Sequence, residues 1–117
     1  MSGMTEAEAA RAGGKMDYAF LENELKHFLD AGGKLIKYPS KYKLKVYALY
    51  YLASKLEHGK RYTEKEINSV LREWHTFDDW ALLRRDLYDK RFLDRESNGS
   101  FYWLEETQPT LESLKLT

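Results

Sequence analysis

The residues with the clearest chemical potential are lysines gathered in the stretch 34–61. This stretch carries eight Lys and Arg residues and a single acid, Glu57. Four of its lysines, interleaved with Tyr38 and Tyr42, are candidate contacts to phosphate groups: Lys37, Lys41, Lys43 and Lys45. Ammonium groups spaced in this way can neutralise neighbouring phosphates of a nucleic acid. The alternative is an ordinary solvated surface, which is where most charge runs lie.

A second group of candidate phosphate contacts consists of four arginines: Arg84, Arg85, Arg91 and Arg95. Residues 78–95 hold five basic and five acidic side chains, and Asp86 and Asp89 would repel a phosphate backbone from the same helix. For the first two arginines, the alternative is therefore an internal salt bridge, to Glu66 or Asp79.

Signals for catalysis and for metal binding are missing from the sequence. It has no glycine-rich phosphate loop, no Gly-x-Ser-x-Gly motif and no cysteine. Its three histidines, His27, His58 and His75, stand far apart. The two carboxylates of Thr-Glu-Lys-Glu at 63–66 are better explained by helix capping than by acid–base chemistry. We therefore expect a non-enzymatic protein with no cofactor and no bound metal.

The composition predicts one soluble domain. The chain has 117 residues, no net charge and 15% aromatic residues, which is enough for a packed core. No apolar run approaches the roughly 18–20 residues of a membrane span. The N-terminus also lacks the apolar stretch of a secretory signal. We expect a cytoplasmic protein that does not bind membranes.

Apolar spacing predicts two helices in the first half of the chain, after a flexible tail over residues 1–16. The first helix spans about 17–31, where apolar residues recur every three or four positions and Gly32-Gly33 supplies a stop. A short strand at Leu35-Ile36 follows. The second helix, over 44–57, is apolar almost all round, which predicts neighbours on several sides.

Capping signals define two further helices. Thr63 and Glu66 have the spacing of a capping box at the start of a helix over 64–74. Asp78 is a suitable N-cap for a helix over 78–90, and only His-Thr-Phe separates the two helices. Such a short connection is typical of a helix-turn-helix.

The C-terminal part is predicted to be a β-hairpin followed by a polar tail over 105–117. Strands over 92–96 and 100–104 flank Asn98-Gly99, which favours a type I′ turn with positive φ at both central residues. We expect a short strand at Arg61-Tyr62 to join the same sheet.

Helix, strand, helix, helix and hairpin is the order of a winged helix. The predicted fold class is thus α+β and mostly helical, with a helix-turn-helix, a C-terminal hairpin as the wing, and an extra N-terminal helix. A single domain is expected to span residues 17–104.

Several short motifs resemble those of a known bacterial family. They are a Pro-x-Lys entry at Pro39 and Lys41, the run Tyr62 to Asn68, an Asp ahead of Leu83 to Leu87, and a finish at Gly99, Tyr102 and Trp103. Over about 33–104 the chain resembles the bacterial domain-of-unknown-function family 2087. That family is associated with transcriptional regulators, sometimes behind an ArsR-like helix-turn-helix, so the resemblance implies a regulatory context. No catalytic or binding residues are established for it, and none is carried over.

Two functions follow as hypotheses. The first is a DNA-binding module for transcriptional regulation, whose lysines at 37–45 and arginines at 84–95 hold double-stranded DNA. The second is a protein-interaction module that keeps the same fold and uses an aromatic surface, without nucleic acid. Zero net charge favours the second, whereas the basic stretch and the resemblance favour the first.

Overall fold

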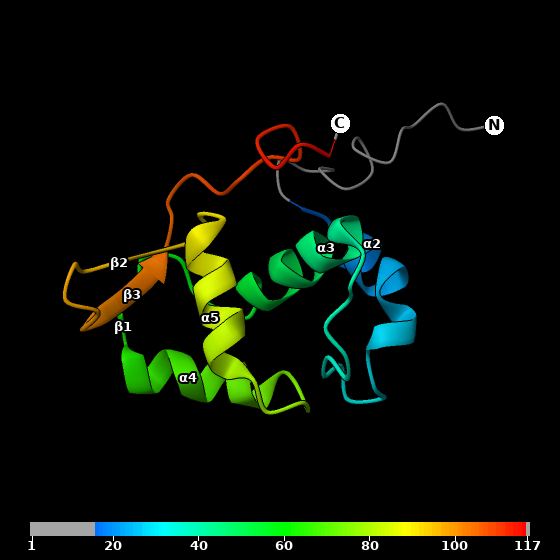
Figure 1. Cartoon of the computed structure of the whole chain (residues 1–117), viewed down its shortest axis with the longest axis horizontal. Coiled ribbons are helices and arrows are strands. Elements are labelled where there is room, and N and C mark those ends of the chain that lie inside the picture. Colours follow the sequence, from blue (N-terminus) through cyan, green and yellow to red (C-terminus); the bar gives the residue numbers. More distant parts are fainter. Residues whose placement is uncertain (1–15, 117) are drawn as a thin grey trace.

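The computed structural model describes residues 16–116, which form four α-helices, one 3₁₀ helix and a small antiparallel sheet (Figure 1). In chain order these elements are α2 (Tyr18–Glu24), η2 (Lys26–Phe28), α3 (Tyr42–Ala53), β1 (Tyr62–Thr63), α4 (Glu64–Glu73), α5 (Trp80–Asp89), β2 (Leu93–Arg95) and β3 (Phe101–Leu104). The predicted α+β class with mostly helical content is confirmed. The flexible tail predicted over 1–16 lies, except for Met16, outside the described residues.

The first helix is shorter than the predicted span of 17–31. It is capped by Asp17, whose side chain accepts from the Ala19 amide, and its α-helical part ends at Glu24. The prediction was wrong about the end because Leu29 is extended and forms an isolated β-bridge with Leu35. The side chain of Asp30 accepts from two backbone amides of the following turn, a local alternative to helical bonds that periodicity does not reveal.

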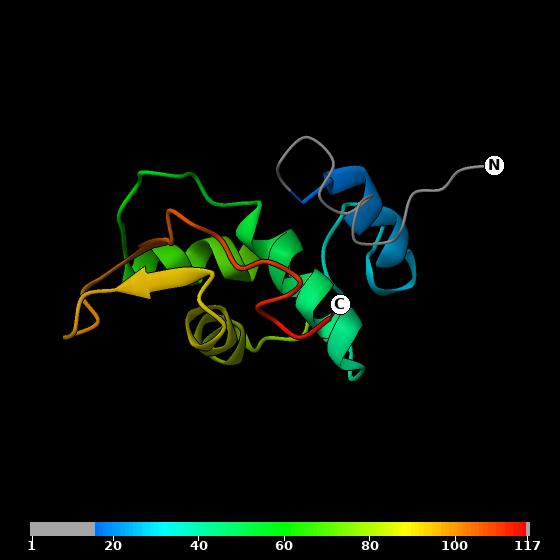
Figure 2. The same cartoon turned by 90° about the horizontal axis from the view of Figure 1, so that it is seen from above.

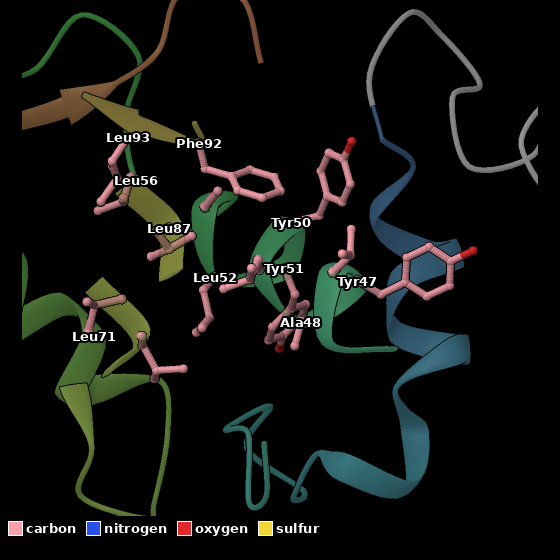
Figure 3. Packing of buried hydrophobic residues seen from close by; sticks show 14 of the residues in the cluster. Tyr47, Ala48, Tyr50, Tyr51, Leu52, Leu56, Leu71, Leu87, Phe92 and Leu93 are labelled. Carbon is pink, nitrogen blue, oxygen red and sulfur yellow. The ribbon is translucent and has the colours of Figure 1, made fainter. Parts of the chain in front are cut away.

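Helix α3 is the centre of the core, as its all-round apolar sequence predicted. Every residue from 46 to 53 is buried. On one side the Tyr47 ring meets Phe20 of α2 edge to face, with the ring centres 5.5 Å apart. On another side the Tyr50 ring meets Phe92, with the ring centres 4.7 Å apart; Figure 3 shows these two residues. Full burial of one leucine contributes about 1.5–3 kcal/mol, so this helix anchors its neighbours. Its bounds, Tyr42–Ala53, lie a few residues ahead of the predicted 44–57.

The capping box at the start of α4 is confirmed. The Thr63 hydroxyl accepts from the Glu66 amide at 3.1 Å, and the Glu66 carboxylate accepts from the Thr63 amide at 2.8 Å. These hydrogen bonds lower the pKa of Glu66, because they favour its charged form.

Asp78 was predicted as the N-cap of α5, and this prediction was wrong, because the N-cap is Asp79. Asp78 has a φ of +55°, and the Asp79 side chain accepts from the Leu82 amide. The buried His75 holds this turn, since its Nε2 accepts from the Asp79 amide at 2.9 Å. Its Nδ1 must then carry the proton, which it donates to the Leu71 carbonyl at 2.5 Å.

The sheet has the order β1-β3-β2, with Tyr62 opposite Tyr102 and Arg95 opposite Tyr102 on the other side. The short strand expected at 61–62 is thus present one residue later. The predicted type I′ turn is wrong: Gly99 has a φ of +74°, but Asn98 is not in the left-handed region. The Asn98 side chain instead accepts from the Ser100 amide, in a longer loop closed between Glu96 and Phe101.

The segment after β3 lies along α3, and both views show it there (Figures 1 and 2). Leu111 and Leu114 are buried and join the core. The Tyr50 hydroxyl donates to the Pro109 carbonyl at 2.6 Å, and the Tyr42 hydroxyl donates to the Leu114 carbonyl at 2.9 Å. The stretch predicted as a polar tail therefore adds two leucines to the core.

Candidate functional site

Tyr38 connects the lysine-bearing segment to helix α5. Its hydroxyl donates a hydrogen bond of 2.7 Å to the carboxylate of Asp86, in the middle of α5. Its ring lies parallel to that of Phe77, with the ring centres 6.4 Å apart. Lys45, one turn inside α3, places its ammonium 5.1 Å from the centre of the Tyr38 ring. The start of α3 and the middle of α5 are therefore neighbours.

Burial and the contact with Asp86 set the protonation of Tyr38. Burial contributes most, followed by the hydrogen bond and the negative charge of Asp86, and all three raise the pKa of Tyr38. The phenol thus stays neutral and remains a donor at physiological pH. A second contact supports the same arrangement, because the Lys90 ammonium at the end of α5 lies 5.2 Å from the Tyr42 ring.

Five of the eight predicted site residues are exposed: Lys37, Lys41, Lys43, Arg85 and Arg91. Arg85 lies on the outer face of α5, since Leu83 and Leu87 on either side of it in sequence are fully buried. The predicted lysines and Arg85 therefore come from two segments that the Tyr38 contact brings together.

Arg84 points into the domain. Its guanidinium donates to the side-chain oxygen of Asn68 on α4, and it lies 3.9 Å from the Glu64 carboxylate. The centre of the guanidinium is 5.7 Å from the Tyr102 ring of β3. The predicted partners were Glu66 or Asp79, but the acid in contact is Glu64. Arg84 thus links α5 to α4 and to the sheet.

The other two arginines lie at the base of the hairpin. Arg91 forms an ion pair of 2.7 Å with Glu105. Arg95, half-buried in β2, stacks its guanidinium 4.9 Å from the ring centre of Tyr88 on α5. Arg95 therefore lies where the hairpin meets α5, whereas Arg91 is paired with Glu105 of the segment after β3.

The acidic side chains of this region have different surroundings. Asp86 accepts the Tyr38 hydroxyl, and Asp94 accepts from the Arg95 amide at 2.8 Å. Asp89, one turn after Arg85, is exposed. Because a hydrogen bond from a neutral donor leaves a carboxylate charged, repulsion of an anionic ligand from α5 would come from Asp86, from Asp89 and from the helix start near Asp78.

Within residues 16–116, no cluster of three or more His, Asp or Glu side chains is arranged to hold a metal ion. In the same part of the chain, none of the helices has the length and apolar character needed to cross a bilayer.

Two features of the site have no signal in the sequence. The pairing of Tyr38 with Asp86 joins residues 48 positions apart, and nothing in either local pattern indicates it. The hydrogen bond between Arg84 and the side chain of Asn68 joins α5 to α4, and the sequence does not identify the two residues as partners. The only available hint was that a buried polar group needs a hydrogen-bond partner.

The family described as "Uncharacterized protein conserved in bacteria (DUF2087)" matches residues 34–104. The match covers more than half of the chain, from the segment before α3 to the end of β3, and the chain belongs to this family. It includes Tyr38, α5 and all eight predicted site residues. No curated protein and no solved structure matches the chain.

Proposed function

We propose that this chain is a winged-helix module that binds double-stranded DNA in a transcriptional-regulatory role. In this proposal α4 and α5 are the helix-turn-helix, α5 is the helix that faces the major groove, and the β2–β3 hairpin is the wing. The order of α3, β1, α4, α5 and the hairpin supports it, as does the pairing of β1 with the central strand β3.

The observation that carries the proposal is the hydrogen bond between Tyr38 and Asp86. It brings the exposed lysines around the start of α3 next to the helix that carries Arg85. Cations from two segments on one side of the molecule can contact phosphates that flank a groove.

The roles of the eight arginines and lysines divide accordingly. Direct phosphate contacts are assigned to Lys37, Lys41, Lys43 and Arg85, with Arg95 at the wing. Lys45 supports Tyr38, and Arg84 and Arg91 hold the domain together through Glu64 and Glu105.

Binding should depend on salt in proportion to the number of phosphates neutralised. With about five contacts, log K should fall against log salt with a slope near −4.5, at about −0.9 for each phosphate. The double variant Lys41→Gln, Arg85→Gln removes one cation from each segment and should reduce the slope by about 1.8. The double variant Lys26→Gln, Lys65→Gln makes the same charge change at exposed sites on η2 and α4, and should leave the slope unchanged.

The protein-interaction alternative is favoured by a different observation. Ile36 and Tyr42 expose 44% and 43% of their surfaces on the same segment as the lysines, which suits an apolar partner. If a labelled duplex shows no binding at low salt, the DNA proposal is wrong and this alternative remains. Equal salt slopes for both double variants would place the DNA contacts elsewhere.

A further inference from the structure

The side chain of Lys55 ends in a cage of three aromatic rings. Its ammonium nitrogen lies 3.9 Å from the ring centre of Trp74, 4.4 Å from that of Tyr51 and 4.6 Å from that of Tyr18. The same nitrogen donates a hydrogen bond of 2.5 Å to the Tyr18 hydroxyl. Several ring faces around one cation are the arrangement by which proteins bind alkylated ammonium groups. The contacts of Lys55 thus demonstrate that this cage accepts a cation.

The walls of the cage are held in place by the fold. Tyr18 belongs to α2, Tyr51 to α3, and Trp74 is the C-cap of α4. The rings of Tyr18 and Tyr51 stack with their centres 5.5 Å apart, and the Tyr51 hydroxyl donates to the Gly33 carbonyl at 2.6 Å. Because Tyr51 is fully buried, the cage does not need to be assembled when a ligand arrives.

A cavity of about 380 Å³ adjoins the cage and is lined by all three rings. Its charged lining residues are two exposed carboxylates, Glu22 and Asp30, and one ammonium, Lys26. The surplus of negative charge favours a cationic ligand. Burial, the contact with Tyr18 and these two carboxylates raise the pKa of Tyr51, so the ring is that of a neutral phenol.

We propose that this cage is a binding site for an alkylated ammonium group, carried either by a small choline-like molecule or by a trimethyllysine side chain. Lys55 occupies the site in the free protein and leaves it when the ligand binds. The exchange is favourable because a lysine ammonium is strongly hydrated and recovers its hydration free energy when it returns to water. An alkylated ammonium has no donors to satisfy and keeps its contacts with the ring faces. This site is formed by α2, α3 and α4 and does not depend on the DNA-binding proposal.

The direct test is a titration of the full isotope-labelled chain with choline chloride, followed by NMR at the indole N–H of Trp74. Sodium chloride at equal ionic strength controls for salt, and 3,3-dimethylbutan-1-ol supplies the same shape without the charge. We expect choline to shift the Trp74 signal and the neutral alcohol to leave it in place. Equal shifts with the two compounds would overturn the proposal, because the site would then be an apolar hollow.

Variants of Lys55 test whether it is the competing occupant. Lys55→Ala should bind choline about tenfold more tightly than the natural chain, since an intramolecular competitor acts at millimolar effective concentration. Lys55→Arg keeps a cation in the cage and should show no gain. If Lys55→Ala retains its dispersed NMR spectrum and does not bind choline, Lys55 is only a link between helices and the proposal is wrong.

Removal of one aromatic ring of the cage should abolish the tighter choline binding expected for Lys55→Ala. In the Lys55→Ala chain, Tyr18→Leu removes a wall that is 39% exposed and so should be tolerated by the fold. Choline binding that persists unchanged in this double variant would contradict the cage.

Peptides with a trimethyllysine or an unmodified lysine separate the two sources of the ligand. Preference for choline indicates a small molecule, and preference for the trimethyllysine peptide indicates a protein tail.

Discussion

Replacing Tyr38 with phenylalanine removes one hydroxyl and leaves the ring between Phe77 and Lys45. The hydroxyl donates to the Asp86 carboxylate at 2.7 Å, and the pair is partly buried. Hydrogen bonds to charged groups contribute about 1.5–3 kcal/mol, and partial exposure places this one near the lower end, at about 1.5 kcal/mol. The melting temperature should fall by about 6 °C, at about 4 °C for each kcal/mol in a domain of this size.

Urea unfolding of Tyr38→Phe measures this loss directly. The matched control is Tyr42→Phe, whose hydroxyl donates to the uncharged Leu114 carbonyl at 2.9 Å and should cost only about 0.5–1 kcal/mol. Tyr38→Phe should also weaken duplex binding, because Asp86 is released and the lysine segment loses its link to α5. A loss of stability no larger than that of the control would refute our account of this contact.

The same bond gives stability a dependence on alkaline pH. The pKa of Tyr38 is raised above its usual value near 10, so the folded state holds the phenolic proton more tightly than the unfolded state. Its contribution is therefore complete below about pH 10 and is lost as the pH rises through the raised pKa. Between about pH 9 and pH 11, the free energy of unfolding should fall less steeply for Tyr38→Phe than for the natural chain. Parallel curves would show that Tyr38 is not the titrating group.

Three further variants test the supports of the site, each by urea unfolding. Thr63→Ala removes the N-cap of α4 and should lower the free energy of unfolding by about 1 kcal/mol without changing ligand binding. An unchanged urea midpoint would show that the capping box contributes nothing to stability. His75→Phe leaves the Asp79 amide without its partner, whereas the Leu71 carbonyl still accepts from the Trp74 amide, so the variant should cost about 1–3 kcal/mol; a loss below 1 kcal/mol would contradict the hydrogen bond between His75 and Asp79. Leu114→Ala should cost about 2 kcal/mol, and a neutral result would mean that the segment after β3 does not pack on α3 in solution.

Local signals in the sequence were sufficient where neighbouring residues alone decide the structure. The capping box of α4 needs only Thr63 and Glu66, and the burial of α3 follows from its own residues. The end of α2 was misjudged because Leu29 pairs with Leu35, a contact that periodicity within a helix does not contain. The turn at Asn98 was misjudged because its side chain bonds forward to Ser100 in place of a left-handed backbone.

The candidate site was predictable in its residue types and not in its arrangement. The exposed lysines were identified from charge alone. Whether they share a face with α5 depends on Tyr38 and Asp86, which are distant in sequence. The division of the arginines also depends on tertiary contacts, since Arg84 and Arg85 are adjacent and only Arg84 turns toward α4.

The central claim is that the segment before α3 and the outer face of α5 form one surface for DNA. NMR of the isotope-labelled chain during titration with a duplex at low salt tests it most directly. We predict shifts of amide signals at 37–45, around Arg85 and at the hairpin near Arg95, with α2 unaffected. Shifts confined to α2 and α4, or no shifts at low salt, would contradict the claim.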